Sequence, residues 1–241
     1  MIENTATPIL QIQKQNEKLI KEIEIICNIL YDAQESLKIV DYLYADDENG
    51  DLVYTKHLNA FFYWARVSQW KTVIIELFKL FGESENFYIK TFLNKLGRKG
   101  IFEGIIDEIS IKAWKERIKI CDPIITKLRN QRNKTIAHKD RDILVDIKEF
   151  ERENEISIEE VRELIVIVQQ VAREIYKVVK QTDFMINSPI NSPVDNLKWI
   201  IKELTDKRSE NLRPLFVEAI KYGLKDELPK SEQQEGHKLT A

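Results

Sequence analysis

The sequence predicts an all-α fold, a bundle of four long helices with small additional helices. Glycine and proline are scarce, at 7 and 6 of the 241 residues, whereas a protein built of strands needs turn residues far more often. Apolar residues also recur three and four positions apart over long stretches, which is the period of a helix with one buried face. Because 43% of the residues are hydrophobic and 32% are charged, we expect a packed core beneath a strongly charged surface.

The first helix is expected at about residues 8–44. From position 19 onward its apolar spacing alternates between four and three residues, which predicts a seam that packs against another helix. The polar residues at 46–51 favour a turn and end this helix. The seam consists of Leu19, Ile23, Ile26, Leu30, Ala33, Leu37 and Val40.

The second helix is expected at about residues 56–81, and Gly82 marks its C-terminal end. Its apolar side chains cover most of the circumference, which indicates a central position in the bundle. The aromatic run Phe-Phe-Tyr-Trp at 61–64 has the residue types of a base-stacking platform, but its helical spacing predicts that it belongs to the core. A shorter helix is expected at about 86–96.

The third helical region is expected from about 102 to 137. The pair Asp122-Pro123 lies inside it and either starts a fresh helix or marks a kink in a continuous one. After a charged stretch at 139–155, with a short extended piece at 143–145, Ser157 and Glu160 form a capping box that opens the fourth helix. The predicted core face of that helix is Val161, Leu164, Ile165, Val168, Ala172, Ile175 and Val179.

The C-terminal part of the chain is expected to be separate from the bundle. The tripeptide Asn-Ser-Pro occurs twice, at 187–189 and 191–193, and breaks any helix. We therefore predict a helical bundle at 1–185, a linker at 186–194, short helices within 195–225 and a polar, disordered tail at 226–241. The short helices are expected at about 196–204 and 214–222.

Charge and cysteine content restrict the class of protein. The formal net charge of −3 argues against a globally basic nucleic-acid binder, although a local basic patch remains compatible with it. No signal peptide and no apolar run of membrane-spanning length is recognisable, so we expect a soluble, cytoplasmic protein. Cys27 and Cys121 are far apart and match no motif, which predicts buried thiols in a reducing compartment. No metal-binding motif occurs, and we expect no cofactor.

The segment at 128–140 is the one stretch that suggests chemistry, because it gathers Arg, Asn, Lys and His at the end of a helix. Arg129 and Arg132 lie three residues apart and share a helix face. Arginine offers a permanently charged fork for phosphate oxygens, and His138 exchanges protons near neutral pH. This combination suits a phosphodiester.

Each of these residues also has a structural explanation. His138 at a helix C-terminus complements the helix dipole and bonds the last carbonyl groups. Arg132 has many carboxylates available for a salt bridge, and Arg129 and Lys134 are either solvated or attract phosphate. The basic turn at 97–100 lacks the pattern of a phosphate-binding loop.

The same segment carries a family resemblance. Arg132-Asn133, followed by four residues and His138, resembles the R-x(4–6)-H pattern of HEPN domains. The context Arg-Asn-Lys-x-x-Ala-His-Lys-Asp at 132–140 and the stretch 62–81 resemble the abortive-infection, AbiU-like branch of that superfamily. The resemblance covers residues 10–185. Many relatives carry Asp after the arginine, so Asn133 keeps the hydrogen bonding of that position and loses its charge.

The resemblance implies a metal-independent endoribonuclease of the toxin or phage-defence type, acting as a homodimer with a composite cleft. It implies that Arg132 and His138 are catalytic, that Asn133 supports them, and that RNA is a partner. The adjacent basic residues Arg129, Lys134 and Lys139 are expected to contact RNA phosphates. A cognate antitoxin or defence-system protein is a further expected partner.

The sequence leaves two other hypotheses for the function open. A HEPN module without catalytic activity, acting as a scaffold or antitoxin-like binding partner, fits the same residues, because a fold does not fix a function. An unrelated helical interaction protein is the third.

Overall fold

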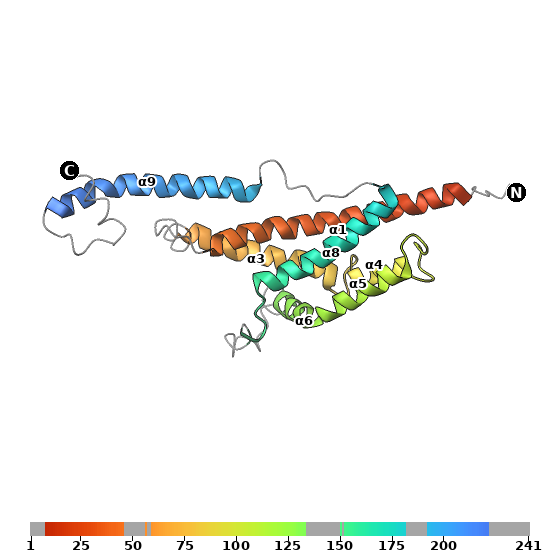
Figure 1. The fold of residues 1–241 in the computed structure, drawn as a ribbon. Coiled ribbons are helices and arrows are strands. Elements are labelled where there is room, and N and C mark those ends of the chain that lie inside the picture. The colour runs from red at the N-terminus through yellow and green to blue at the C-terminus, as the bar shows by residue number, and fades with distance from the viewer. Residues whose placement is uncertain are drawn as a thin grey trace. The chain divides into compact units, whose positions relative to one another are not determined.

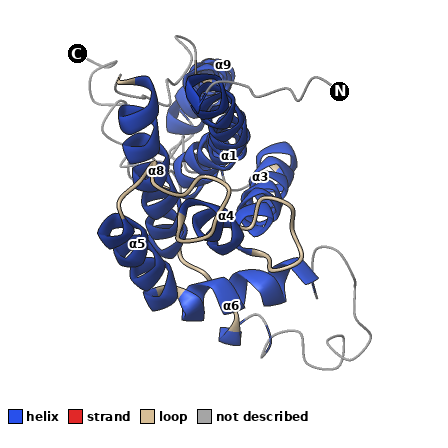
Figure 2. Cartoon of the chain, turned by 90° about the vertical axis from the view of Figure 1, so that its right-hand side faces the viewer, coloured by secondary structure: helices blue, strands red, loops and turns tan. Residues whose placement is uncertain are grey.

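A computed structural model of the chain describes residues 8–45, 56, 59–133, 150, 152–181 and 192–221. These residues form helices joined by turns, and no strand occurs in these ranges (Figure 1, Figure 2). The all-α prediction is therefore confirmed. The helices are α1 (Pro8–Tyr44), α3 (Ala60–Phe81), α4 (Ile89–Leu96), α5 (Glu108–Ile120), α6 (Asp122–Asn130), α8 (Ile158–Lys180) and α9 (Pro193–Lys221).

The chain divides into two compact units by its internal contacts. The first comprises Met1–Leu37 and Gln69–Ser188, and the second comprises Lys38–Ser68 and Pro189–Ala241. Helices α1 and α3 each contribute residues to both units. The expected bundle at 1–185 with separate C-terminal helices stays a prediction. The candidate site belongs to the first unit.

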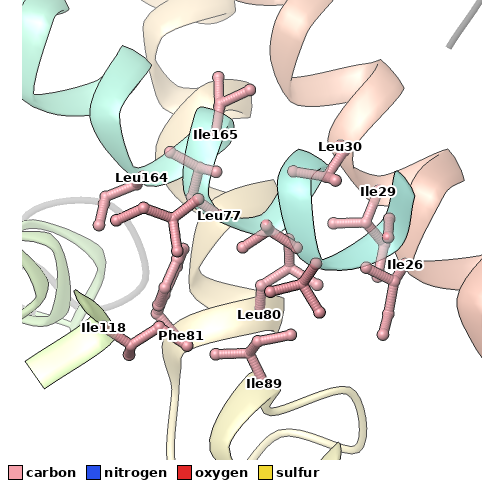
Figure 3. Close-up of a cluster of buried hydrophobic side chains, with 14 of the residues drawn as sticks. Ile26, Ile29, Leu30, Leu77, Leu80, Phe81, Ile89, Ile118, Leu164 and Ile165 are labelled. Carbon is pink, nitrogen blue, oxygen red and sulfur yellow. The ribbon is translucent and has the colours of Figure 1, made fainter. Parts of the chain in front are cut away.

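The core of the first unit is built by helices α1, α3, α4, α5, α6 and α8, and side chains of all of these except α6 are labelled in Figure 3. The predicted seam of α1 is confirmed, because every seam residue from Leu19 to Val40 is buried. Burying one large apolar side chain contributes about 1.5–3 kcal/mol, so these contacts dominate the stability of the unit. The labelled residues are Ile26, Ile29, Leu30, Leu77, Leu80, Phe81, Ile89, Ile118, Leu164 and Ile165.

Helix α8 is anchored by polar contacts as well as by its buried face. The predicted capping box is present, since the Ser157 side chain accepts from the Glu160 N–H while the Glu160 carboxylate accepts from the Ser157 N–H. Lys127 of α6 donates to the same carboxylate at 2.9 Å. Against the opposing effect of desolvation, these bonds hold the pKa of Glu160 below its usual value. On the other side of α8, Gln169 donates to Gln34 of α1 at 2.9 Å.

The third predicted region is broken into two helices. Helix α5 begins at Glu108 rather than near position 102, because the Asp107 carboxylate caps it by accepting from the Ser110 N–H at 2.8 Å. The chain then turns at Cys121, and α6 starts afresh with a proline in its first turn. The fresh-helix alternative is thus correct, although Asp122 lies inside the first turn and Cys121 occupies the capping position.

The prediction for the aromatic run of α3 is wrong at most of its positions. Phe62 is buried and forms a small core with Leu43 and Ile201 in the second unit. In contrast, Phe61 and Trp64 are 70% and 62% exposed. The helical periodicity identified an apolar face of α3, but the elements that pack on this face cover only part of it. The described helix also starts at Ala60, later than expected.

The C-terminal region forms one long helix where two short ones were expected. Helix α9 runs from Pro193 to Lys221 and contains Pro214 in its interior. An internal proline costs about 3 kcal/mol in a helix because it removes one hydrogen bond and crowds the preceding turn. The stretch 195–213 contains neither glycine nor proline, so no strong helix breaker precedes Pro214 within the helix. The expected tail at 226–241 and extended piece at 143–145 lie outside the described residues.

Both cysteines are buried free thiols, as predicted. Burial, with a smaller contribution from the charge of Glu24, raises the pKa of Cys27 to about 12. Burial and the neighbouring Glu163 raise the pKa of Cys121 to about 11. Thiolates are therefore scarce at neutral pH, and nucleophilic chemistry at these residues is disfavoured. None of the described helices is long and apolar enough to span a membrane.

Candidate functional site

The predicted site lies at the C-terminal end of α6. The buried side chains Ile125 and Leu128 fix one face of this helix in the core, which turns its basic last turn outward. Beyond Asn130 the backbone continues through residues 131–133 as a wider, π-helical turn. Such turns are rare and recur at functional sites. Arg132 and Asn133 lie in this turn.

Arg132 is held by three neighbours. Its guanidinium carbon lies 4.7 Å from the centre of the Phe78 ring, which is cation–π distance. Its Nη1 donates to the Asn133 side-chain oxygen at 2.9 Å. Its Nη2 lies 4.0 Å from Glu85, too far for a hydrogen bond. Since Asn133 uses only one of the five N–H donors and the side chain is 33% exposed, the guanidinium remains able to bind an oxyanion.

Arg129 faces the same part of the chain. Its Nη2 donates to Glu83 at 2.8 Å, and Glu83 and Glu85 both belong to the turn between α3 and α4. The prediction that Arg129 and Arg132 share a face is consistent with these contacts. Both members of the Arg129–Glu83 pair are exposed, and such pairs contribute at most about 1 kcal/mol. A phosphate group could therefore displace Glu83 at little cost.

The Phe78 ring beneath Arg132 is held by a close approach of the chain. Gly82 is buried directly after α3, and its N–H donates to the Phe78 carbonyl at 2.7 Å. A Cβ atom at Gly82 would lie 2.7 Å from a Phe78 ring carbon and 2.8 Å from the Phe78 carbonyl oxygen. Glycine is therefore required at this position because a Cβ atom would clash with Phe78, and not because the backbone is left-handed.

We expect Gly82→Ala to destabilise the protein and to displace the Phe78 ring. Forcing an additional methyl group into a packed site typically costs about 1–3 kcal/mol. Thermal unfolding followed by circular dichroism would measure the loss. Gly97→Ala is a matched control at the end of α4, because a Cβ there would meet its nearest atom at 3.7 Å. Equal unfolding temperatures for the two variants would contradict the steric argument.

A buried amide network lies behind the π-helical turn. Asn130 donates through its side chain to the Asn154 side-chain oxygen at 2.7 Å, and Gln131 donates to the Asn154 main-chain oxygen at 2.7 Å. The Asn154 side chain in turn donates to the carbonyl of Phe150 at 2.9 Å. Asn154 is 7% exposed. These bonds join two chain positions more than twenty residues apart.

Sequence reasoning missed this network and the neighbours of Arg132. The adjacency of Asn130 and Gln131 to Arg132 was a usable signal, because two amides at a helix end commonly bond other backbone groups. Nothing in the sequence singled out Asn154 or Phe78. His138, Lys134 and Lys139 lie outside the described residues. Within the described ranges, no group of three His, Cys, Asp or Glu side chains lies together in a way that could hold a metal ion.

Comparison with known proteins gives one result. The sequence model of the HEPN AbiU2 family matches residues 16–198, which is most of the chain and extends from within α1 to the first residues of α9. No curated protein and no solved structure matches the chain.

Proposed function

Since the chain belongs to the AbiU2 family of HEPN proteins, related to abortive infection, we propose that it is a metal-independent endoribonuclease of the toxin or phage-defence type. The observation that carries the proposal is the setting of Arg132. A partly exposed guanidinium rests on the Phe78 ring at the end of a helix, with donors left for an anion. A phosphodiester of RNA is the anion that this arrangement and the family favour.

The reaction needs no nucleophile from the protein. The ribose 2′-hydroxyl already lies beside the scissile phosphate, so its oxygen forms the new bond to phosphorus while the bond to the 5′-oxygen breaks. A base takes the proton of the 2′-hydroxyl, and an acid gives a proton to the leaving 5′-oxygen. The products are a 2′,3′-cyclic phosphate and a free 5′-hydroxyl. We assign the proton transfers to His138.

Arg132 would stabilise the negative charge that builds up on the phosphorus-bound oxygens. A preorganised charged donor contributes most in this role, and Arg132 is preorganised by Phe78 and Asn133. The neutral amide of Asn133 orients the guanidinium without pairing its charge. A carboxylate at that position would compete with the phosphate for the same donors.

The remaining parts of the proposal concern partners. Arg129, Lys134 and Lys139 would contact phosphates of a cytoplasmic RNA. A homodimer would place two copies of the segment across one cleft, and a cognate antitoxin or defence protein would control access to it.

Incubation of the purified full-length chain with labelled RNA tests the proposal. We expect cleavage that persists in excess chelator, with products that end in a 2′,3′-cyclic phosphate. Treatment of the products with acid, which opens a cyclic phosphate, should change their mobility. Cleavage that requires Mg²⁺, or products ending in a 3′-hydroxyl, would contradict the mechanism.

A HEPN module without catalytic activity is the second candidate. It is favoured by the carboxylates of Glu83 and Glu85, which lie beside Arg129 and Arg132 and reduce the local positive charge. A scaffold or antitoxin-like partner would need no phosphate at this place. Intact RNA after prolonged incubation, under conditions where the protein is folded, would favour this candidate.

A further inference from the structure

The buried amide network behind α6 contains none of the residues that take part in the proposed reaction. Asn154 is almost completely buried, and burial of an amide is costly unless its donor and acceptor atoms are bonded. Here the Asn154 side chain accepts from Asn130 and donates to the carbonyl of Phe150. A hydrophobic residue would fill this space without that demand, so the network supplies orientation in addition to packing.

The orientation concerns the turn that carries Arg132. Asn130 and Gln131 immediately precede Arg132, and both of their side chains bond to Asn154. At the same place the helix widens into the π-helical turn at 131–133. Widening a helical turn by one residue changes the direction in which its side chains point, and here these side chains are Arg132 and Asn133. The Phe78 ring and Asn133 fix the guanidinium itself.

We propose that Asn154 is a positioning residue for Arg132, acting through Asn130 and Gln131 to hold the π-helical turn in the register that places the guanidinium on Phe78. This proposal rests on the proposed function for its effect on catalysis, but its structural part does not depend on that function. Asn154 touches no reacting atom. It also ties together both ends of the chain segment that contains His138, because Gln131 precedes that residue and Asn154 follows it.

The amide pair of Gln34 and Gln169 provides a matched control. It is also a partly buried side-chain hydrogen bond, at 2.9 Å, between distant chain positions of the first unit. It joins α1 to α8, and neither side chain is hydrogen-bonded to the described turn at 131–133. Loss of either pair should lower the thermal stability. Only loss of the Asn154 pair should affect Arg132.

The experiment compares Asn154→Ala with Gln169→Ala in the full-length chain by two readouts. In RNA cleavage, Asn154→Ala should lower kcat about 10- to 100-fold with little change in KM, since a small misplacement of a catalytic group has effects of this size. Gln169→Ala should keep the kcat of the parent. A kcat for Asn154→Ala equal to that of the control would overturn the role in the reaction.

The second readout does not require activity. In a spectrum of ¹⁵N-arginine-labelled protein, the Nε–H signal of Arg132, assigned by its absence from Arg132→Lys, should carry the ring-current shift of Phe78. Asn154→Ala should move this signal towards the position of a solvated arginine, and Gln169→Ala should not. An unchanged signal in Asn154→Ala would overturn the proposal. If the parent cleaves no RNA, the proposed function fails and this readout alone decides the positioning role.

Two further variants keep the test decisive if Asn154→Ala does not fold. Asn130→Ala removes the same hydrogen bond from the less buried partner and should give the same signal shift and loss of kcat. The double variant of Asn130 and Asn154 should lose no more kcat than the stronger single variant, because both changes remove the same Asn130–Asn154 hydrogen bond. Additive losses would show that the two residues act independently and would contradict the proposal.

Discussion

Replacing His138 or Arg132 with alanine is expected to reduce RNA cleavage by about 100- to 1,000-fold or more, because each change removes a group that the proposed mechanism places at the transition state. Arg132→Lys should recover little of the activity. A lysine ammonium is a point charge that cannot bond two phosphate oxygens in one plane, and it stacks less well on the Phe78 ring. Single-turnover rates on one RNA substrate would measure these losses.

The loss should be specific to chemistry and not to folding. Arg132 lies at a helix end with its side chain partly exposed, so its removal should change the thermal midpoint only slightly. Arg162→Ala is a suitable control, because Arg162 is an exposed arginine of α8 that pairs with Glu159. It should cleave like the parent. A variant lacking both Arg132 and His138 that cleaves as fast as the parent would refute the assignment and favour the non-catalytic module.

The second large effect concerns assembly. We expect the protein to sediment as a dimer of about twice the 28.4 kDa chain mass at micromolar concentration. The reasoning is chemical, because the segment at 132–138 supplies one histidine whereas the cleavage uses both a base and an acid. Two copies related by a twofold axis would supply both groups. Sedimentation equilibrium would measure the mass.

Subunit mixing connects the dimer to the activity. After exchange of subunits, an excess of inactive His138→Ala protein should lower the activity of the parent, because parent subunits become trapped in mixed dimers with one histidine. Activity that depends only on the amount of parent protein would indicate that each chain works alone. A strict monomer in sedimentation would contradict the composite cleft directly.

Features with a local cause were predictable from the sequence. The seam of α1 follows from a spacing that repeats through the helix itself, and its members from Leu19 to Val40 are buried as expected. The capping box is specified by Ser157 and Glu160, which lie within one stretch of four residues. The pairing of Arg129 and Arg132 on one face follows from helical pitch. These patterns need no knowledge of the rest of the fold.

Features that depend on distant residues were not predictable in this way. The exposure of Phe61 and Trp64 is decided by which elements cover that end of α3, and a single helix cannot specify its own partner. The contact between Asn130 and Asn154 joins positions 24 residues apart, and although an amide at a helix end suggests a hydrogen bond, the sequence does not identify Asn154 as its partner. The continuation of α9 through Pro214 was not predictable either, because a proline locally favours a helix end.

The uneven exposure of the tryptophans gives each unit its own optical signal. Trp64 and Trp199 of the second unit are 62% and 64% exposed, whereas Trp114 of the first unit is 5% exposed and Trp70 is half-buried. A water-soluble quencher such as acrylamide should therefore quench the emission of the second unit first, whereas the blue-shifted emission of the buried Trp114 should persist. Because separate units of a chain can open independently, the two emission components can follow each unit through denaturation without any added label.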